Sequence, residues 1–344
     1  MVESYPKPPR EDDAETYAVN AVEVDPKKII LAGDTHGDAN AVKTLLEKAR
    51  DIEADALFVL GDFGIWDHHD GGSFTNHVTR FTERYETPVF FLPGNHDNYD
   101  LLFEWEATKP RTSDGFYEIR PNLFYSPRGH RWTWNGVKFL SLGGAYSVDK
   151  EWRVIDDAAS LYRAERRLRL EMPLTPRERY LVDKGQWSWW SQEEISEQEM
   201  RDAMKGGPVD IMLAHDKPRD ARPDWNRKDL VECWPNQEKL QSVVDAVLPL
   251  LYVHGHLHYA YRDYFPRTGT VVQGLDCDPA ASRSSGGSGK VNKSWVLLSL
   301  NVEVTPVERG IQIDGVDKDG NAVSHNYVLT DLESVGRTAE LLED

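Results

Sequence analysis

Short apolar runs that alternate with amphipathic segments are the feature that most restricts the fold of this chain. Residues 38–51 and 73–86 carry apolar side chains at helical spacing, and Asp38 is the predicted N-cap of the first segment. Strands that alternate with helices pair in parallel through helical crossovers, so the pattern predicts an α/β fold. The runs that have the length and composition of buried strands are KKIILAG (27–33), ALFVLGDFG (56–64) and TPVFFLPGN (87–95).

Further strand signals follow after Asp97. An Asn135-Gly136 pair lies between two β-rich runs and predicts a hairpin. A helix is predicted over residues 236–248. The remaining runs are expected to be strands: 209–216 and 250–258 buried, 268–275 and 293–304 antiparallel.

Composition distinguishes a main domain, two segments within it, and an extension at each end. Residues 1–26 are a polar, proline-containing lead-in. Residues 150–205 are a highly charged insertion that is expected to cap the main sheet, with a helix from Gln192 to Lys205. A Gly/Ser-rich stretch, residues 282–290, is expected to be flexible. The main domain is therefore predicted over 27–305, followed by a polar C-terminal extension over 306–344.

Charge and apolar length restrict the partners. The 344 residues carry a net charge of −18, which disfavours long nucleic acids without excluding them, because phosphate neutralisation supplies most of their affinity. The negative charge does not exclude a small phosphate ester, because bound metal cations can neutralise the charge of that ester locally. No apolar run approaches the ~20 residues that cross a bilayer, and the N-terminus lacks the apolar core of a secretory signal. We therefore expect a cytoplasmic protein without membrane partners. Its two cysteines do not suit a disulfide framework or a thiolate zinc site.

Each of five predicted strands is followed at once by side chains of the kinds that bind metal ions. Ligands in open α/β sheets bind outside the carboxyl ends of the strands. If the five strands lie in one sheet, the five polar sets meet at one edge. The sets are Asp34 with His36, Asp62, Asn95 with His96 and Asp97, His215 with Asp216, and His254 with His256 and His258.

The spacing and the chemical types within these sets favour one metal site. Side chains two residues apart on an extended chain point the same way, so Asp34 and His36 are expected to face one point, as are His256 and His258. Carboxylate, imidazole and one carboxamide, without thiolate, suit Mn²⁺, Fe or Zn²⁺ at five- or six-coordination. Glycines that allow sharp turns and close approach stand at positions 33, 61, 94 and 255.

The order D-x-H, GD, GNHD, H and GH-x-H, over about residues 28–262, resembles that of the calcineurin-like metallophosphoesterases. The resemblance implies an α/β fold, a four-layer α/β/β/α sandwich of two mixed β-sheets flanked by helices. It also implies two divalent metal ions, with Mn²⁺ favoured and Fe, Zn²⁺ or Ni²⁺ as alternatives. His96 is then expected beside the substrate as proton donor or transition-state stabiliser, with Asp97 orienting it by a hydrogen bond. The implied ligands are Asp34, His36 and His258 for one metal, Asn95, His215 and His256 for the other, and Asp62 as the bridge.

One departure from the family pattern bears on the substrate. Many relatives carry a second Asp three residues after the bridging one, and phosphoprotein phosphatases follow it with an arginine. Here Ile65 stands in that place, and the GNHD motif ends in Asp where those phosphatases have Glu. Both differences weaken a protein-phosphatase function. The stretch GGAYSVDKEWR (143–153) loosely resembles uncharacterised bacterial and phage members and names no substrate.

The predicted function is a metal-dependent phosphoesterase that hydrolyses small phosphodiesters, cyclic nucleotides among them. A hydroxide that bridges two cations about 3.5–4 Å apart would attack phosphorus in line. The alternatives are a nuclease on DNA or RNA, a phosphomonoesterase or protein phosphatase, and a non-catalytic phosphoester sensor. The sequence leaves the oligomeric state open.

Several other polar residues have two open interpretations. His254 is either close to the metals or a packed structural histidine. Lys150 and Arg153 either meet a substrate phosphate or form a solvated surface, and the surface is favoured. Asp216 and Lys217 either line the cleft or belong to an ordinary loop. A tryptophan cluster either stacks a nucleobase or packs the insertion on the core; its members are Trp187, Trp189 and Trp190.

Overall fold

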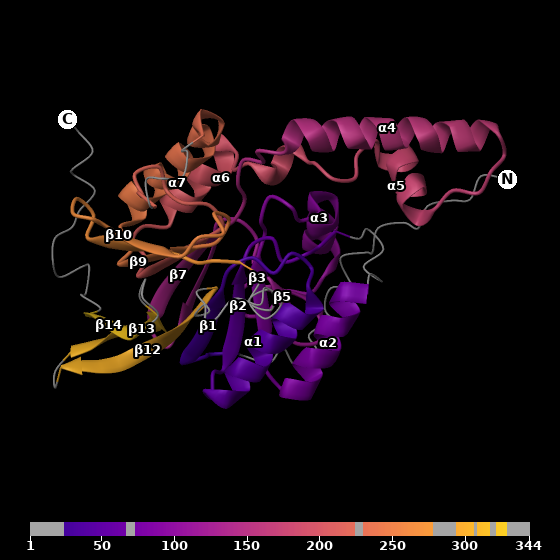
Figure 1. Cartoon of the computed structure of the whole chain (residues 1–344). Coiled ribbons are helices and arrows are strands. Elements are labelled where there is room, and N and C mark those ends of the chain that lie inside the picture. The colour runs from indigo at the N-terminus through magenta and orange to yellow at the C-terminus, as the bar shows by residue number, and fades with distance from the viewer. Residues whose placement is uncertain are drawn as a thin grey trace, which may run out of the picture.

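Two β-sheets packed face to face form the centre of the molecule in the computed structural model (Figure 1). The structure describes residues 24–66, 73–223, 230–277, 294–305, 308–316 and 321–328. Most of the predicted lead-in and the whole Gly/Ser-rich stretch lie outside these residues. Within them, no helix combines the length and the apolar composition that crossing a bilayer requires.

The larger sheet begins with the predicted strand–helix alternation. Strands β1, β2 and β3 pair in parallel, and helices α1 (Ala39–Asp51) and α2 (Ser73–Tyr85) make the two crossovers. Asp38 caps α1 as predicted, because its side chain accepts a hydrogen bond of 2.8 Å from the Asn40 amide. The described part of this sheet has the order β14-β13-β12-β1-β2-β3-β5-β4. Its strands are β1 (Lys28–Ala32), β2 (Ala56–Leu60), β3 (Val89–Leu92), β4 (Tyr117–Arg120), β5 (Leu123–Tyr125), β12 (Trp295–Thr305), β13 (Glu308–Val316) and β14 (Ala322–Val328).

The smaller sheet contains the predicted hairpin and both later buried strands. It has the order β10-β11-β9-β8-β7-β6, and β7, β8, β9 and β11 run parallel. The two runs expected to be antiparallel strands lie in different sheets: β11 pairs antiparallel with β10 here, and β12 pairs antiparallel with β1 in the larger sheet. The strands are β6 (His130–Trp134), β7 (Val137–Leu142), β8 (Ile211–Ala214), β9 (Leu251–His254), β10 (Tyr261–Phe265) and β11 (Thr270–Gly274).

Three apolar layers hold the two sheets and their helices together. An aromatic-rich layer lies between the sheets, where Phe58 stacks on Phe90 and Trp132. A second layer joins the larger sheet to α1, α2 and α3 (Tyr99–Thr108). A third joins the smaller sheet to α6 (Glu197–Lys205) and α7 (Trp234–Val247). This arrangement confirms the predicted four-layer α/β/β/α sandwich of two mixed sheets (Figure 1).

The charged segment after β7 forms helices that reach beyond the sandwich. Helix α4 (Lys150–Arg169) packs against α5 (Pro176–Lys184) and runs along the top of the view in Figure 1. The helix expected from Gln192 begins only at Glu197, because Ser196 forms a capping box with Glu199. A short 3₁₀ turn, η2 (Ser191–Glu193), precedes it.

The polar segment after about residue 306 also contributes to the fold. Strand β13 pairs antiparallel with β12, and β14 pairs antiparallel with β13. Both strands extend the larger sheet on the side of β1 opposite to β2.

Candidate metal centre

Five strand ends meet at one edge of the sandwich, but they come from two sheets. β1, β2 and β3 belong to the larger sheet, and β8 and β9 to the smaller one. The carboxyl ends of all five nevertheless point into a common space, because the two sheets pack with these strand ends together. The condition that the five strands share one sheet was therefore wrong, whereas the polar sets do come together.

One half of the centre is built around Asp34, which is 1% exposed. Its Oδ2 lies 3.0 Å from His258 Nε2 and 3.7 Å from His36 Nε2. One donor atom from each of these three residues lies within 4.8 Å of the others. Asp34 Oδ1 accepts the backbone N–H of His256 at 2.9 Å, so a loop of the smaller sheet is tied to the end of β1.

The other half is built around Asp62, which is also 1% exposed. His215 Nε2 lies 3.4 Å from Asp62 Oδ1 and 3.0 Å from Asn95 Oδ1. The other ring nitrogen of His215 donates to the Leu60 carbonyl at 2.7 Å, which directs Nε2 toward the site. The ring of His256 lies 5.0 Å from that of His215 between centroids. Asp62 lies between the halves, since its Oδ2 is 3.8 Å from His36 Nε2.

The electrostatics of this cluster fit a site for cations. Burial raises the pKa of Asp62, but the charge and hydrogen bond of His215, together with the contacts to His96, lower it more, so the carboxyl stays ionised. Burial lowers the pKa of His215, yet the carboxylates of Asp62 and Asp34 raise it to about 9. The hydrogen bond to Asp34, with a smaller effect of Cys277, raises the pKa of His258 to about 11. Protons on these imidazoles balance the acids where metal ions would otherwise do so. The set of carboxylate, imidazole and carboxamide donors fits divalent Mn, Fe or Zn.

The backbone at the site adopts conformations that the sequence pattern did not predict. Asp34 and His36 do face one point, but the expected extended chain is wrong, because His36, His256 and His258 have φ of 45°, 62° and 48°. Asp62 also has a positive φ, of 45°. Turns in the left-handed region, rather than alternation along a strand, aim these side chains inward. Such strained conformations in non-glycine residues cluster at functional sites.

Close backbone approach explains one of the predicted glycines especially well. A Cβ added at Gly94 would lie 2.0 Å from Oδ1 of Asp62 and 2.2 Å from its backbone nitrogen. Only glycine therefore lets the loop after β3 cross the end of β2 at this distance.

His96 lies at the rim of the site with its side chain one-third exposed. Its backbone N–H donates to Asp62 Oδ1 at 2.8 Å. A guanidinium nitrogen of Arg153 lies 3.4 Å from Nδ1 of the ring, and Asp149 Oδ2 lies 4.0 Å from Nε2. A guanidinium only donates, so Nδ1 accepts and a neutral His96 carries its proton on Nε2.

The predicted role of Asp97 is corrected by its contacts. Its carboxylate accepts backbone N–H groups of Gly94, Gly64 and Ile65 at 2.8, 3.0 and 2.9 Å, and no bond to His96 forms in the described residues. Asp97 is completely buried, and these amides lie in the loops after β2 and β3. It therefore holds the two loops together instead of orienting the ring of His96.

A buried polar network from the charged segment supports Asn95. The Asn95 amide donates to Ser147 Oγ at 2.9 Å, which leaves its carbonyl oxygen facing His215. Arg153 is only 3% exposed, donates to Glu193 at 2.6 Å and also contacts Ser147. The favoured surface position of Arg153 was therefore wrong. Ser147 and Glu193 carried no sequence signal, because a hydroxyl and a carboxylate in a charged segment usually face solvent.

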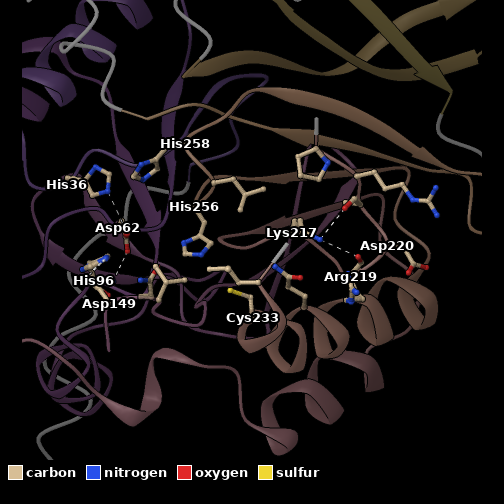
Figure 2. A pocket seen from close by; sticks show the side chains of 18 residues that line it. His36, Asp62, His96, Asp149, Lys217, Arg219, Asp220, Cys233, His256 and His258 are labelled. Atoms are coloured by element: carbon tan, nitrogen blue, oxygen red, sulfur yellow. Dashed lines mark hydrogen bonds and ion pairs between the residues drawn. The ribbon is translucent and has the colours of Figure 1, made fainter. Parts of the chain in front are cut away.

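A cleft of about 1000 Å³ opens from the centre toward the loop after β8. Figure 2 shows His36, Asp62 and His96 at one end, and Lys217, Arg219 and Asp220 at the other. Lys217 thus lines the cleft, and its ammonium donates to the Ala221 carbonyl at 3.1 Å. Asp216 is buried behind it.

The remaining candidates have mainly structural contacts. His254 is buried between Gly255 and Tyr261, and burial lowers its pKa to about 3, so it is a packed neutral histidine. The ammonium of Lys150 lies 4.3 Å from the centre of the Trp189 ring. Trp190 is buried with the layer under the larger sheet.

A two-sheet α/β sandwich with buried acids, imidazoles and a carboxamide at one edge defines a protein with a site for divalent metals. The chain belongs to the calcineurin-like phosphoesterase family, whose model matches residues 27–260. This match confirms the resemblance that the five motifs indicated. No curated protein matches the sequence.

Several solved structures are similar to this chain. A dimetal phosphatase from Danio rerio is 15% identical, with a TM-score of 0.45, and the match covers 88% of this chain and 100% of that one. An archaeal phosphodiesterase is 12% identical, with a TM-score of 0.32 and coverage of 87% and 99%. Yfce, a phosphoesterase from E. coli, is 11% identical, with a TM-score of 0.33 and coverage of 87% and 98%.

Proposed function

We propose that this chain is a metal-dependent phosphodiesterase that hydrolyses small phosphodiesters, cyclic nucleotides among them. The observation that carries the proposal is the convergence of two buried carboxylates with imidazoles from both sheets. Asp34 and Asp62 each accept a backbone N–H from an opposing loop, so both are held in place before any ligand binds. Family membership supplies the phosphoester chemistry.

Two divalent cations, with Mn²⁺ favoured, fit the donor set. Bound there, they would supply Lewis-acid activation of water and neutralise charge on the phosphoryl group. The residues proposed to hold them are Asp34, His36 and His258 on one side, Asn95, His215 and His256 on the other, and Asp62 between them.

His96 is the proposed proton donor. Hydrolysis forms a bond from a water oxygen to phosphorus and breaks the bond from phosphorus to the leaving oxygen, which then takes up a proton. Because Arg153 occupies Nδ1, the proton on Nε2 of His96 is the one available to the leaving oxygen. Asp149 Oδ2 lies 4.0 Å from this nitrogen, on the same side of the ring as the transferable proton.

Diesters are favoured over monoesters by the room around the centre. A cleft of about 1000 Å³ continues from the metal centre past His256 to Arg219, which leaves space for a second ester substituent. The net charge of −18 argues against long nucleic acids, whose phosphates it would repel.

A substrate panel with Mn²⁺ tests the proposal. It compares 2′,3′- and 3′,5′-cyclic nucleotides, bis(p-nitrophenyl) phosphate, an oligonucleotide, a phosphopeptide and a simple monoester, with metal content measured on the same protein. We expect the highest kcat/KM on small diesters. A preference for the oligonucleotide or the phosphopeptide would overturn the substrate assignment, and full metal content without any turnover would favour a sensor.

A further inference from the structure

A second cavity lies on the other side of His96 and contains no proposed metal ligand. It has a volume of about 280 Å³ and is formed by the loops after β2 and β3, the first turns of α4 and α5, and the segment after α5. Four of its nine lining residues are tryptophans, and two are arginines. The lining residues are Trp66, His96, Trp152, Arg153, Asp156, Arg177, Trp187, Ser188 and Trp190.

The position of His96 connects this cavity to the metal centre. His96 lines both the cavity and the large cleft, so its ring lies at the boundary between them. Trp66 packs beside the loop that carries His36, because its indole would lie 3.2 Å from a Cβ added at Gly37. When a phosphoryl group is held at the metal centre, one of its ester substituents can therefore reach this cavity.

The indoles offer surfaces that the fold itself does not use. Trp152 is 68% exposed and Trp66 is 44% exposed, although exposing a tryptophan to water is unfavourable. In contrast, Trp187 is fixed, since it contacts the Tyr180 ring at 5.3 Å and the Arg177 guanidinium at 5.5 Å. One rigid and two exposed aromatic surfaces surround the same small space.

Polar groups at the cavity add hydrogen-bonding capacity for the edge of a ring. The ion pair of Arg177 with Asp156, 3.2 Å apart, supplies both a donor and an acceptor.

We propose that this cavity, defined by Trp66, Trp152, Trp187 and Trp190, binds the aromatic ring of one ester substituent of the substrate. The ring is that of a nucleobase or of an aryl group, and both share the flat π surface that stacks on indole. The volume suits one ring system and is below that of a site for a drug-sized molecule, about 300–1,000 Å³. The proposal deepens the proposed function, on which it rests, by naming a substrate class.

Equilibrium dialysis with the full chain in EDTA tests ring recognition without turnover. The probes are adenosine 5′-monophosphate, phenyl phosphate and ribose 5-phosphate, which has the sugar and the phosphate but no aromatic ring. We expect one or both aromatic probes to bind more tightly than ribose 5-phosphate. Tight binding of the nucleotide alone identifies a base subsite, and equal binding of phenyl phosphate identifies a general aryl subsite. Equal binding of all three probes overturns the proposal.

Two exposed tryptophans provide variants that leave the core intact. Trp66→Ala and Trp152→Ala should each weaken binding of the preferred aromatic probe by about five- to 100-fold and leave ribose 5-phosphate unchanged. Trp189→Ala is the matched control. Like Trp152, Trp189 belongs to the charged segment after β7, but it does not line the cavity and instead contacts Lys150. Equal losses in the control and in both cavity variants would also overturn the proposal.

Failure of this inference can be told apart from failure of the proposed function. The Mn²⁺-loaded chain and its Trp152→Ala variant are assayed on the best phosphodiester of the panel and on a dialkyl phosphodiester. A rise in KM confined to the aromatic ester supports the cavity. If both esters are hydrolysed and the ratio of their KM values is the same in the variant and the unmodified chain, only the cavity proposal is overturned. If neither ester is hydrolysed, the proposed function is overturned, and the dialysis result decides the cavity proposal.

Discussion

The guanidinium of Arg153 lies 3.4 Å from Nδ1 of His96, and the two side chains come from segments 57 residues apart. The same guanidinium lies 3.5 Å from the Asn95 carbonyl oxygen and pairs with Glu193. One buried side chain of α4 therefore contacts both the proposed proton donor and the backbone of a proposed metal ligand. The charged segment is a structural part of the site.

Replacing Arg153 tests whether its guanidinium positions Asn95 and His96. We expect Arg153→Met to lower kcat/KM or metal affinity by about 10–100-fold, since the groups around a metal ligand fix its orientation. The guanidinium also fixes the tautomer of His96, so part of the loss should appear in kcat. Steady-state kinetics with metal analysis provides the measurement.

A second arginine of α4 is the control for that variant. Arg167 pairs with Glu178 at 3.3 Å, and its side chain is 36% exposed. Arg167→Met should leave metal content and kcat/KM within about twofold, as expected for an exposed ion pair. Equal losses in both variants would show that α4 acts only through overall stability.

The strand ends could be predicted from the sequence because their signals are local. An apolar run followed by Asp or His predicts both a strand and the position of the polar side chain at its end. This signal was enough to predict β1, β2 and β3 with their polar groups. The division between two sheets was not, because local pattern does not say which strands share hydrogen bonds. The left-handed φ of Asp62 was also hidden, since nothing in the residue type requires it.

The parts that failed depend on contacts between distant segments. Asp97 follows His96 directly, yet its carboxylate reaches the amides of Gly64 and Ile65 in another loop. Arg153 stands in a highly charged stretch, which predicts solvent exposure, but Glu193 and Ser147 satisfy it inside the protein. The partners of Asp97 in the other loop and the Glu193 partner of Arg153 all lie more than 30 residues away in the sequence. No local sequence pattern predicts such contacts.

His96 and Asp62 should differ in what their removal costs. His96→Ala is expected to lose about 10²–10⁴-fold in kcat and to keep its metals, because only proton transfer is removed. Asp62→Ala should lose both metal ions, since Asp62 lies between the two groups of donors. Metal content and turnover are measured on the same samples, and full activity of His96→Ala would remove its proposed role.

Gly94 should tolerate no side chain. In Gly94→Ala the new methyl group would lie 2.0 Å from Oδ1 of Asp62, so that carboxylate must move. We expect a loss of about 1–3 kcal/mol in the free energy of unfolding and a clear loss of bound metal. Gly129→Ala is the control for metal content, because its added methyl group meets nothing within 4 Å and only the strain of its φ of 74° should lower stability. Normal metal content in Gly94→Ala would contradict the proposed crossing of the two loops.

Metal binding should release protons. The pKa of His215 is raised to about 9 and that of His258 to about 11, so at pH 7 both imidazoles are protonated without metal. Ligation needs the neutral ring, so metal affinity should rise with pH up to these values and fall as pH decreases. Titration calorimetry with Mn²⁺ in two buffers of different ionisation enthalpy should show release of up to about two protons. A binding heat that is independent of the buffer would contradict this assignment.

His130 should make the fold sensitive to acid at a distance from the metal centre. Burial lowers its pKa to about 4, against 6.5 for an unperturbed histidine, and it lies between Ser126 and the Asp114 carbonyl. Between these two pH values the unfolded chain binds the proton and the folded protein does not, so its contribution is present above pH 6.5 and declines as pH falls toward 4. From pH 7 to 5 this amounts to about 2 kcal/mol. His130→Gln should therefore lose less stability over that interval than the unmodified protein does, as measured by urea unfolding at both pH values. An equal loss in the two proteins would assign the acid sensitivity to other groups.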